Sequence, residues 1–545
     1  MFEQDADSYF DRAVAAVEDG RFYTALHYAR RAARLDSYSI DAMMLIAEIY
    51  TEMGLYYQAI NQYFKVLTFE EEASECYIAI GQNFYMLDQN LTALKFIKRG
   101  IAGAWDQESL QQAKAVLESV GGENKFRVIS GSRNNELVIS MAQSLIGDGE
   151  YDGAIKLLNF VPEDSAQYPS AALHKAVCLR SLGDYDGSLK LTEEQLKENP
   201  DDISLLCNLV KIYIETKRTA DADGLLEELK TLTAAGRDDS YAIAVALLCG
   251  DKPADAVKFL ERYLESDPYE ANVLTILGQA YHNIGELDKA QECFLAILAV
   301  DDDNIVAKFY NKYIQEARIR KKPALKYIFQ LPLKEVNKTI ARLAKTAGLS
   351  DGGFRDAVLK KGFFEELMWL YGIGRQELYE LINGRLAGVS DRRADDFLRS
   401  ALVDLRVSNL VKKSIFAAML KTGKTKRLAV TVGEDIKFLT VTRPKSLISA
   451  PDHVIGAYSA VFSALAFIAE GFEKKLNAAV NKLNKTFAKH PSLTSVPELA
   501  CMLAYITEGG YLGNLDGIIK IFSADGNAVR EYFKIAKIET LFTEN

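Results

Sequence analysis

A 34-residue repeat constrains this chain more than any other feature of its sequence. Small residues recur at that interval just after a turn, first at Ala25, Ala59 and Ala93. After a gap of 61 residues the interval returns in a second series: Ala154, Ser188, Ala222, Ala256 and Ala290. Such self-similarity indicates stacked copies of one supersecondary unit, because a single unit cannot bury its apolar face alone.

Each copy has the pattern of two helices joined by a turn. A second set of residues, mostly small, precedes the turn at the same interval: Ala13, Ala47, Gly81, Ala142, Ala176, Val210, Ala244 and Gly278. Small residues allow two helices to approach closely, and glycine takes turn conformations that other residues resist. Turn glycines occur at Gly20, Gly54, Gly149, Gly183 and Gly285. One copy departs from the pattern: Gly250 falls one residue early and Pro253 follows it, so we expect a longer turn there.

This pattern resembles the tetratricopeptide repeat (TPR) family. The best match is "LTILGQAYHNIGELDKAQECFLAIL", residues 274–298, and the resemblance covers about residues 6–304 in eight units. It implies an all-α, TPR-type superhelix of helical hairpins. Its concave face, lined by the first helix of each unit, would bind a peptide or a helix of a partner. The resemblance implies no catalysis, because fold and chemistry are separate properties.

The repeats divide the chain into predicted parts. TPR units 1–3 occupy 6–107 and units 4–8 occupy 135–304. Between them, 108–134 reads as a half-repeat helix and a polar linker with Gly131. A capping helix is expected over 305–320, a basic helical region over 321–450 and a further helical region over 451–545. The one clear β-hairpin signal is "KRLAVTVGEDIKFLTVTRP", which places a hairpin at about 426–443.

Candidate partner-binding residues follow from helical spacing around the small positions. Those expected to point outward are Gln82, Tyr85, Gln143, Arg180, Lys211, Gln279 and His282. Gln82, Gln143 and Gln279 hold equivalent places in their units, and a side-chain amide can both donate to and accept from a peptide backbone. Plain surface polarity, or contact between neighbouring units, explains the same glutamines. The lysine-rich clamp that some TPR proteins use for a terminal carboxylate is not visible.

Charge is distributed unevenly. Residues 1–320 carry 31 Lys/Arg and 52 Asp/Glu, a net −21, so the remainder of a chain with net charge −10 carries +11. An acidic and a basic part suggest an intramolecular contact or an acidic protein partner. Two stretches, beginning at Ile340 and Leu367, also resemble helix-turn-helix elements and leave nucleic-acid binding as an alternative. Gly352 and Gly353 at the start of the first reading helix, and Met368 in the second, depart from that pattern.

The stretch "AMLKTGKT", residues 418–425, fits a loose phosphate-binding pattern. A working phosphate-binding loop leaves a strand and enters a helix. Here the flanking text predicts the reverse order, a helix before Gly423 and a strand after it. We therefore interpret Gly423 as a helix C-terminus with favourable lysines beside it.

Other function classes find little support. The six cysteines form no CxxC pair and read as reduced core thiols, and the five histidines are scattered, so we expect no metal site and no cofactor. No catalytic constellation can be assembled, so we expect no enzyme. The acidic start lacks the layout of a secretion signal, and the apolar stretch 454–469 is short for a membrane span, so we expect a cytoplasmic protein.

The sequence therefore predicts a protein-protein interaction scaffold or adaptor, with a protein or peptide partner on the concave TPR face and no membrane partner. The alternative is a nucleic-acid-binding regulator that uses the basic C-terminal region and is controlled through the repeats.

Overall fold

The computed structural model describes most of the chain. The described residues are 5–36, 38–103, 111, 114, 132–147, 149–232, 234, 236–422, 426–441, 444, 447, 450–466, 471–508 and 515–536. The expected half-repeat helix at 108–134 falls almost entirely outside them. Chain contacts define two compact units. Unit 1 comprises residues 1–122 and 334–545, and unit 2 comprises residues 123–333.

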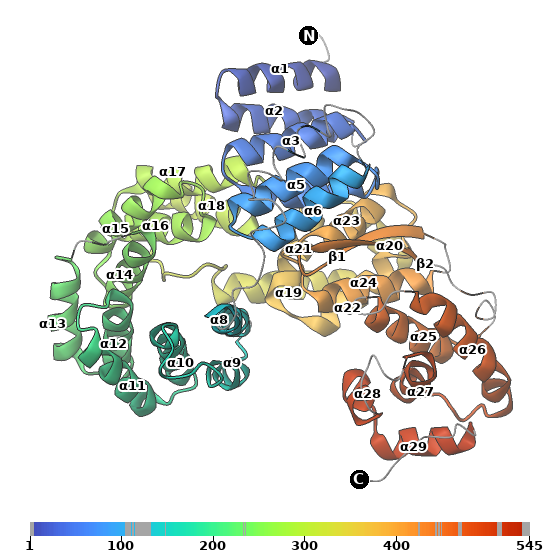
Figure 1. Cartoon of the computed structure of the whole chain (residues 1–545). Helices are drawn as coiled ribbons and strands as arrows, with labels where there is room; N and C mark the ends of the chain where they lie inside the picture. The colour runs from blue at the N-terminus through green and yellow to red at the C-terminus, as the bar shows by residue number, and fades with distance from the viewer. Residues whose placement is uncertain are drawn as a thin grey trace. The chain divides into compact units, whose positions relative to one another are not determined.

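Unit 1 begins with three stacked helical hairpins (Figure 1). They are formed by α1 (Ala6–Glu18) with α2 (Phe22–Leu35), α3 (Ile40–Glu52) with α4 (Tyr56–Leu67), and α5 (Ser74–Met86) with α6 (Asn90–Gly103). The small repeat positions lie where the paired helices meet. Ala25, Ala59 and Ala93 have no exposed surface. A Cβ built on Gly81 would come within 2.6 Å of Ile97 Cγ1, so only glycine fits between α5 and α6.

Unit 2 contains five hairpins and a capping helix. Its helices are α8 (Ser132–Gly147), α9 (Tyr151–Leu158), α10 (Tyr168–Ser181), α11 (Tyr185–Glu198), α12 (Ile203–Glu215), α13 (Thr219–Leu229), α14 (Arg237–Cys249), α15 (Pro253–Ser266), α16 (Ala271–Ile284), α17 (Leu287–Val300) and α18 (Ile305–Ile319). Helix α8 begins inside the segment expected to be linker. Ser188 Oγ donates a hydrogen bond to Ala176 O at 2.7 Å, so this small residue also joins its two helices.

The inter-helix turns share one conformation. The left-handed residue of each turn keeps the repeat interval: Gly20, Gly54, Asp88, Gly149, Gly183, Lys217, Asp251 and Gly285. The expectation of a longer turn near Gly250 is wrong. Residues 250–252 join α14 to α15 just as residues 216–218 join α12 to α13, and Asp251 takes the left-handed conformation with φ of 56°. Aspartate tolerates this region better than most residues, which explains why glycine is dispensable there.

The C-terminal part of unit 1 is helical apart from one antiparallel hairpin. Its helices are α19 (Leu333–Ala347), α20 (Asp351–Val358), α21 (Phe363–Ile373), α22 (Gln376–Leu386), α23 (Arg392–Val403), α24 (Asn409–Lys421), α25 (Asp452–Leu465), α26 (Phe472–Lys489), α27 (Val496–Glu508), α28 (Leu515–Phe522) and α29 (Gly526–Ile535). Strands β1 (Lys426–Val432) and β2 (Asp435–Val441) pair from Val432–Asp435 outward, with Gly433 in the tight turn.

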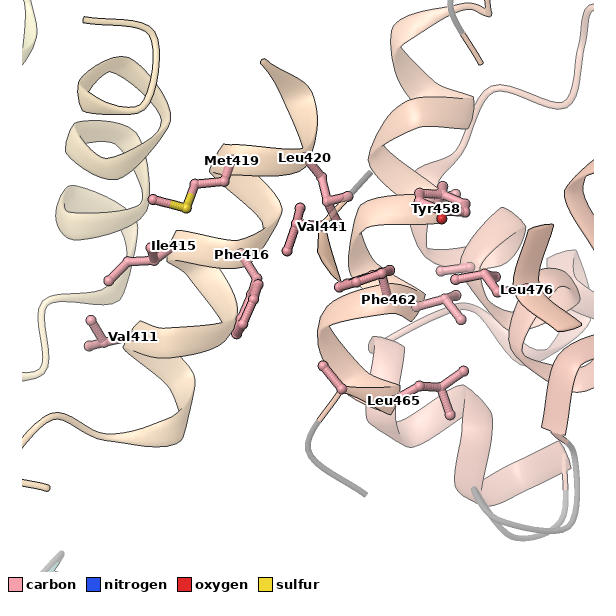
Figure 2. Packing of buried hydrophobic residues seen from close by; sticks show 14 of the residues in the cluster. Val411, Ile415, Phe416, Met419, Leu420, Val441, Tyr458, Phe462, Leu465 and Leu476 are labelled. Carbon is pink, nitrogen blue, oxygen red and sulfur yellow. The ribbon is translucent and has the colours of Figure 1, made fainter. Parts of the chain in front are cut away.

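One hydrophobic cluster extends through this C-terminal part, from Leu343 on α19 to Phe533 on α29. Figure 2 shows its centre, where Phe416 of α24 points toward Phe462 of α25 and Ile415 points to the opposite side of α24. The apolar core therefore continues across the boundary expected at residue 450. Most of the apolar stretch that begins at residue 454 lies in α25 and contributes to this core. None of the described helices is both long and apolar enough to cross a membrane.

Two details bear on earlier expectations. Helix α24 precedes strand β1, which confirms the helix-then-strand order around residues 418–425, although Gly423 itself lies outside the described residues. All six cysteines are free, and five are buried as expected. Cys249 is exposed instead, because it is the last residue of α14 rather than part of the core.

Candidate functional site

Residues 321–332, which we call the strap, connect α18 to α19 without forming a helix or strand. The strap lies against two helices (Figure 1). One is α16, the first helix of the last hairpin, and we call the first helix of each hairpin its inner helix. The other is α18, the capping helix. Its contacts to these helices all lie within unit 2. Leu325 and Tyr327 pack against the hydrophobic cluster of this unit, and Leu331 is buried.

Two side-chain amides of α16 pair with the backbone of the strap. Gln279 Nε2 donates to Ile328 O at 2.8 Å, and the Ile328 amide donates to Gln279 Oε1 at 3.0 Å. One helical turn later, Asn283 Nδ2 donates to Leu325 O at 2.8 Å, and the Leu325 amide donates to Asn283 Oδ1 at 2.7 Å. The later helix residue pairs with the earlier strap residue, so the strap runs antiparallel to α16. Each amide satisfies a backbone donor and acceptor, as a neighbouring strand would.

Hydroxyl and imidazole groups hold the backbone carbonyls on either side of these pairs. Tyr310 Oη donates to Gln330 O at 3.0 Å. Tyr313 Oη and His282 Nε2 both lie within 3.0 Å of Pro323 O. A carbonyl oxygen only accepts, so His282 carries its proton on Nε2. The ring of His282 meets the ring of Tyr313 edge-on at 5.4 Å.

Charge marks the beginning of the strap. Lys322 pairs with Glu316 of α18 at 2.5 Å, and its ammonium lies 4.8 Å from the centre of the Tyr313 ring. Hydrogen bonds from Lys322 and Arg320 lower the pKa of Glu316 to about 2. A cation is therefore favoured where the strap begins to follow α18.

Gln279 and His282 were expected to point outward from the repeat. They do lie on the inner helix, but Gln279 has no exposed surface and His282 is 9% exposed, because the strap covers them. Asn283, Tyr310 and Tyr313 were not among the candidate residues. Asn283 could have been found, since it lies one helical turn after Gln279 on the same face. The two tyrosines belong to the helix expected only to cap the array.

Two other candidates in unit 2, Gln143 and Arg180, contact neighbouring repeats. Gln143 Nε2 lies 2.9 Å from His174 Nε2, and His174 Nδ1 lies 2.7 Å from Ser170 O, so the histidine accepts from the glutamine. Arg180 donates to Asn208 Oδ1 at 3.2 Å and pairs with Glu215 at 2.6 Å. These contacts fit the alternative that inner-face polar residues join adjacent units.

Lys211 lies half-buried in the same inner-face region. Burial lowers the pKa of Lys211, and the positive charge of Arg180 acts in the same direction. Gln82, which is exposed, and Tyr85, which is half-buried, lie on α5 in unit 1. The seven candidates are thus divided between two separately described units.

A second intramolecular contact joins the C-terminal β-hairpin to repeat units 2 and 3, all within unit 1. Ala429 and Ile436 on one face of the hairpin pack with Tyr63 and Phe64 of α4. The opposite face, including Leu428 and Val430, enters the C-terminal core. Because alternate strand residues point to opposite faces, the hairpin has two apolar faces and both are covered.

Asn61 forms the polar centre of this contact. Its side chain donates to Asp404 Oδ1 at 3.3 Å and accepts from the Leu405 amide at 2.9 Å. Burial would raise the pKa of Asp404, but hydrogen bonds and charge from Arg406 outweigh it and the pKa is lowered. Asp404 therefore stays ionised although it is 2% exposed.

At the edge of the hairpin contact, one ion pair has its cation on the hairpin and another has its cation on the repeat. Arg427 donates to both carboxylate oxygens of Glu71, each at 2.7 Å, as the acidic-basic hypothesis predicts. Lys95 of the repeat pairs with Asp435 of the hairpin at 2.6 Å, the opposite arrangement. The contact is therefore chiefly apolar, with mixed charges at its edge. A general attraction between an acidic and a basic part does not describe it.

Comparison with known proteins agrees with the architecture. A family model described as tetratricopeptide repeat matches residues 271–304, which contain α16 and α17. The TPR repeat-containing protein YvcD of Bacillus subtilis is 21% identical over 247 residues, covering 45% of this chain. The chain spans about half the length of that relative, 51%.

Several solved structures are also similar to parts of the chain. The TPR domain of P58(IPK) is 17% identical, with 58% of this chain and 99% of that one covered and a TM-score of 0.24. The MamA protein is 22% identical, with 34% and 98% covered and a TM-score of 0.25. The TPR2AB domain of yeast Sti1, in a complex with pHSP90, is 14% identical, with 48% and 98% covered and a TM-score of 0.20.

The hairpins are stacked, and their small contact residues and left-handed turn residues recur at the same interval along the chain. These features define a helical-repeat protein. Residues 271–304 match the tetratricopeptide repeat family, and the described part of the chain is all-α except for the single hairpin of β1 and β2.

Proposed function

We propose that this chain is a protein-interaction scaffold whose inner repeat face binds an extended peptide segment of a partner. The observation that carries the proposal is the pairing of Gln279 and Asn283 with the backbone of the strap. Backbone pairing provides affinity for any extended chain, and adjacent side-chain contacts provide specificity. The same helices could therefore receive a segment of another protein. Cytoplasmic location and absence of catalysis stay predictions of the sequence.

Peptide selection tests the proposal. A random twelve-residue peptide library would be selected against the full chain, and in parallel against a full chain carrying Leu325→Pro and Ile328→Pro, which removes the two strap amides that pair with Asn283 and Gln279. Affinities of selected peptides would be measured by fluorescence anisotropy. We expect Asn283→Ala to weaken binding by about 10-fold or more, since a lost pair leaves polar groups unsatisfied.

Gln143→Ala is the matched control, because Gln143 is also an inner-face glutamine but contacts His174 rather than the strap. It should leave peptide affinity unchanged. Failure of both chains to select any peptide would contradict the proposal, as would peptide binding that is insensitive to Gln279 and Asn283.

The nucleic-acid alternative rests on the net charge of +11 over residues 321–545. Several of these cations are engaged within the chain: Arg342 with Glu366, Arg399 with Asp395, and Arg427 with Glu71. Paired cations have less charge to offer phosphates. Binding of the full chain to random duplex DNA across a salt series would test the alternative, since phosphate binding weakens steeply as salt rises.

A further inference from the structure

The strap covers the side chains of α16 and α18 that the proposed function assigns to a partner peptide. We infer that the strap is a built-in competitor: it must leave α16 and α18 before an external extended peptide can bind there. This inference rests on the proposed function. It adds that the strap regulates peptide binding, and it names the class of peptide that the site prefers.

The strap is held mainly through its backbone. Gln279, Asn283, His282, Tyr310 and Tyr313 all contact main-chain atoms of the strap. Meanwhile Ala324, Lys326, Phe329 and Gln330 have exposed side chains. Every extended peptide has the same main-chain donors and acceptors, so another segment can replace the strap without any change in these five side chains.

Three features of the strap define what else would fit. Leu325 packs on the hydrophobic cluster, and the Tyr327 hydroxyl lies 2.9 Å from Asn283 Nδ2. The ammonium of Lys322 forms an ion pair with Glu316 and a cation–π contact with the Tyr313 ring. The preferred external ligand is therefore an extended segment with a cation near its start, followed by an aliphatic residue and, two positions later, a tyrosine.

Covalent attachment makes the strap an effective competitor. A short tether gives a segment an effective concentration in the millimolar range, far above that of a free partner in solution. A free peptide must therefore bind much more weakly to the intact chain than to a chain whose strap cannot pair.

The probe is a fluorescein-labelled synthetic peptide with the sequence of residues 319–333. Its affinity would be compared between the full chain and the full chain carrying Leu325→Pro and Ile328→Pro, since proline has no backbone N–H to donate to Asn283 or Gln279.

The two replacements keep the tether length, Lys322 and the buried Leu331. We expect binding at least about 10-fold tighter in the replaced chain. Adding Asn283→Ala to it should abolish the gain, and adding Gln143→Ala should not.

Equal affinity for the intact chain and a folded replaced chain would overturn the inference. If both chains bind library-selected peptides equally well, the proposed function survives and only the competitor role fails. If neither chain binds any peptide, both fail.

If the replaced chain does not fold, a second measurement tests whether a bound peptide displaces the strap. In the unaltered chain, saturating the site with a library-selected peptide should release the strap. Hydrogen exchange at the Leu325 and Ile328 amides should then accelerate about 10-fold or more. Exchange that stays unchanged while the peptide binds in a Gln279-dependent manner would overturn the inference.

Discussion

Asn283 pairs with both backbone groups of Leu325, accepting from its amide at 2.7 Å and donating to its carbonyl at 2.8 Å. The two residues are 42 positions apart. Through this pair, the last repeat hairpin binds a segment of its own chain in an extended conformation.

Asn283→Asp should loosen the strap while changing almost no volume. A carboxylate accepts but cannot donate, so the Leu325 carbonyl and the Tyr327 hydroxyl lose their donor. We expect hydrogen exchange at Leu325 to accelerate about 10-fold at pH 7, as a lost bond of about 1–3 kcal/mol implies. Near pH 4 the carboxyl begins to protonate and regains a donor, so part of the protection should return. Equal exchange in Asn283→Asp and the unaltered chain would contradict this assignment.

Asn61→Ala should weaken the contact between the β-hairpin and repeat units 2 and 3. The substitution leaves the partly buried Leu405 amide without its acceptor, at a cost of about 1–3 kcal/mol. Hydrogen exchange of the β1 and β2 amides measures the loss. Thr92→Ala, which removes a bond to Glu434 at the edge of the same contact, is the control and should cost less than about 1 kcal/mol. A larger effect at Thr92 than at Asn61 would show that the edge, not the centre, holds the hairpin.

Lys412→Met should remove one pH dependence of stability. Lys412 donates to Thr431 O at 3.2 Å and is 2% exposed, and burial lowers its pKa to about 8 while Asp404 opposes the shift. Between pH 8 and 10.5 the unfolded chain holds a proton that the folded chain has released. Stability from this group therefore rises with pH through that window, by up to about 1.4 kcal/mol per unit.

Urea denaturation at pH 7, 8, 9 and 9.5 measures this effect. The range stops there because tyrosines of the unfolded chain ionise near pH 10. Buried thiols such as Cys76 and Cys501, whose pKa is raised in the folded chain, lower stability in the same range but act alike in all three chains. Relative to Lys412→Met, the unaltered chain and the exposed control Lys338→Met should therefore gain stability as the pH rises. An identical pH dependence in all three would show that Lys412 does not contribute to it.

Gly81→Ala should destabilise unit 1 by about 1–3 kcal/mol, because the added methyl meets Ile97 Cγ1 at 2.6 Å and the Ala93 carbonyl oxygen at 3.0 Å. Gly384→Ala is the control in the same unit. A Cβ at Gly384 meets nothing within 4 Å, so alanine should stabilise α22 by up to about 1 kcal/mol. Urea denaturation followed by circular dichroism compares them. Equal effects would mean that α5 and α6 can separate without cost.

Much of the repeat could be predicted from the sequence because its determinants are local. Ala25, Ala59 and Ala93 mark helix pairs within one unit, and each unit contacts mainly its neighbours. The prediction of a longer turn near Asp251 was wrong because it assumed that the left-handed position of each turn must be glycine. The left-handed conformation is required at that position, and aspartate can also adopt it.

The candidate site was only partly predictable. The repeat register placed Gln279 and His282 on an inner helix, but it could not indicate that residues 321–332 would cover them. Those residues belong to no repeat and read simply as a basic segment. Tyr310 and Tyr313 gained a role only because the strap passes them.

The sequence by itself determined the helical hairpins, their interval and the residues at their close contacts, because these depend on neighbours within one or two repeat units. The tertiary structure alone decided what the inner face of the last hairpin holds and how the β-hairpin docks. Asn283 meets Leu325, and Asn61 meets Asp404, across 42 and 343 residues. No local periodicity encodes such contacts, because they depend on where the folded chain brings distant segments together.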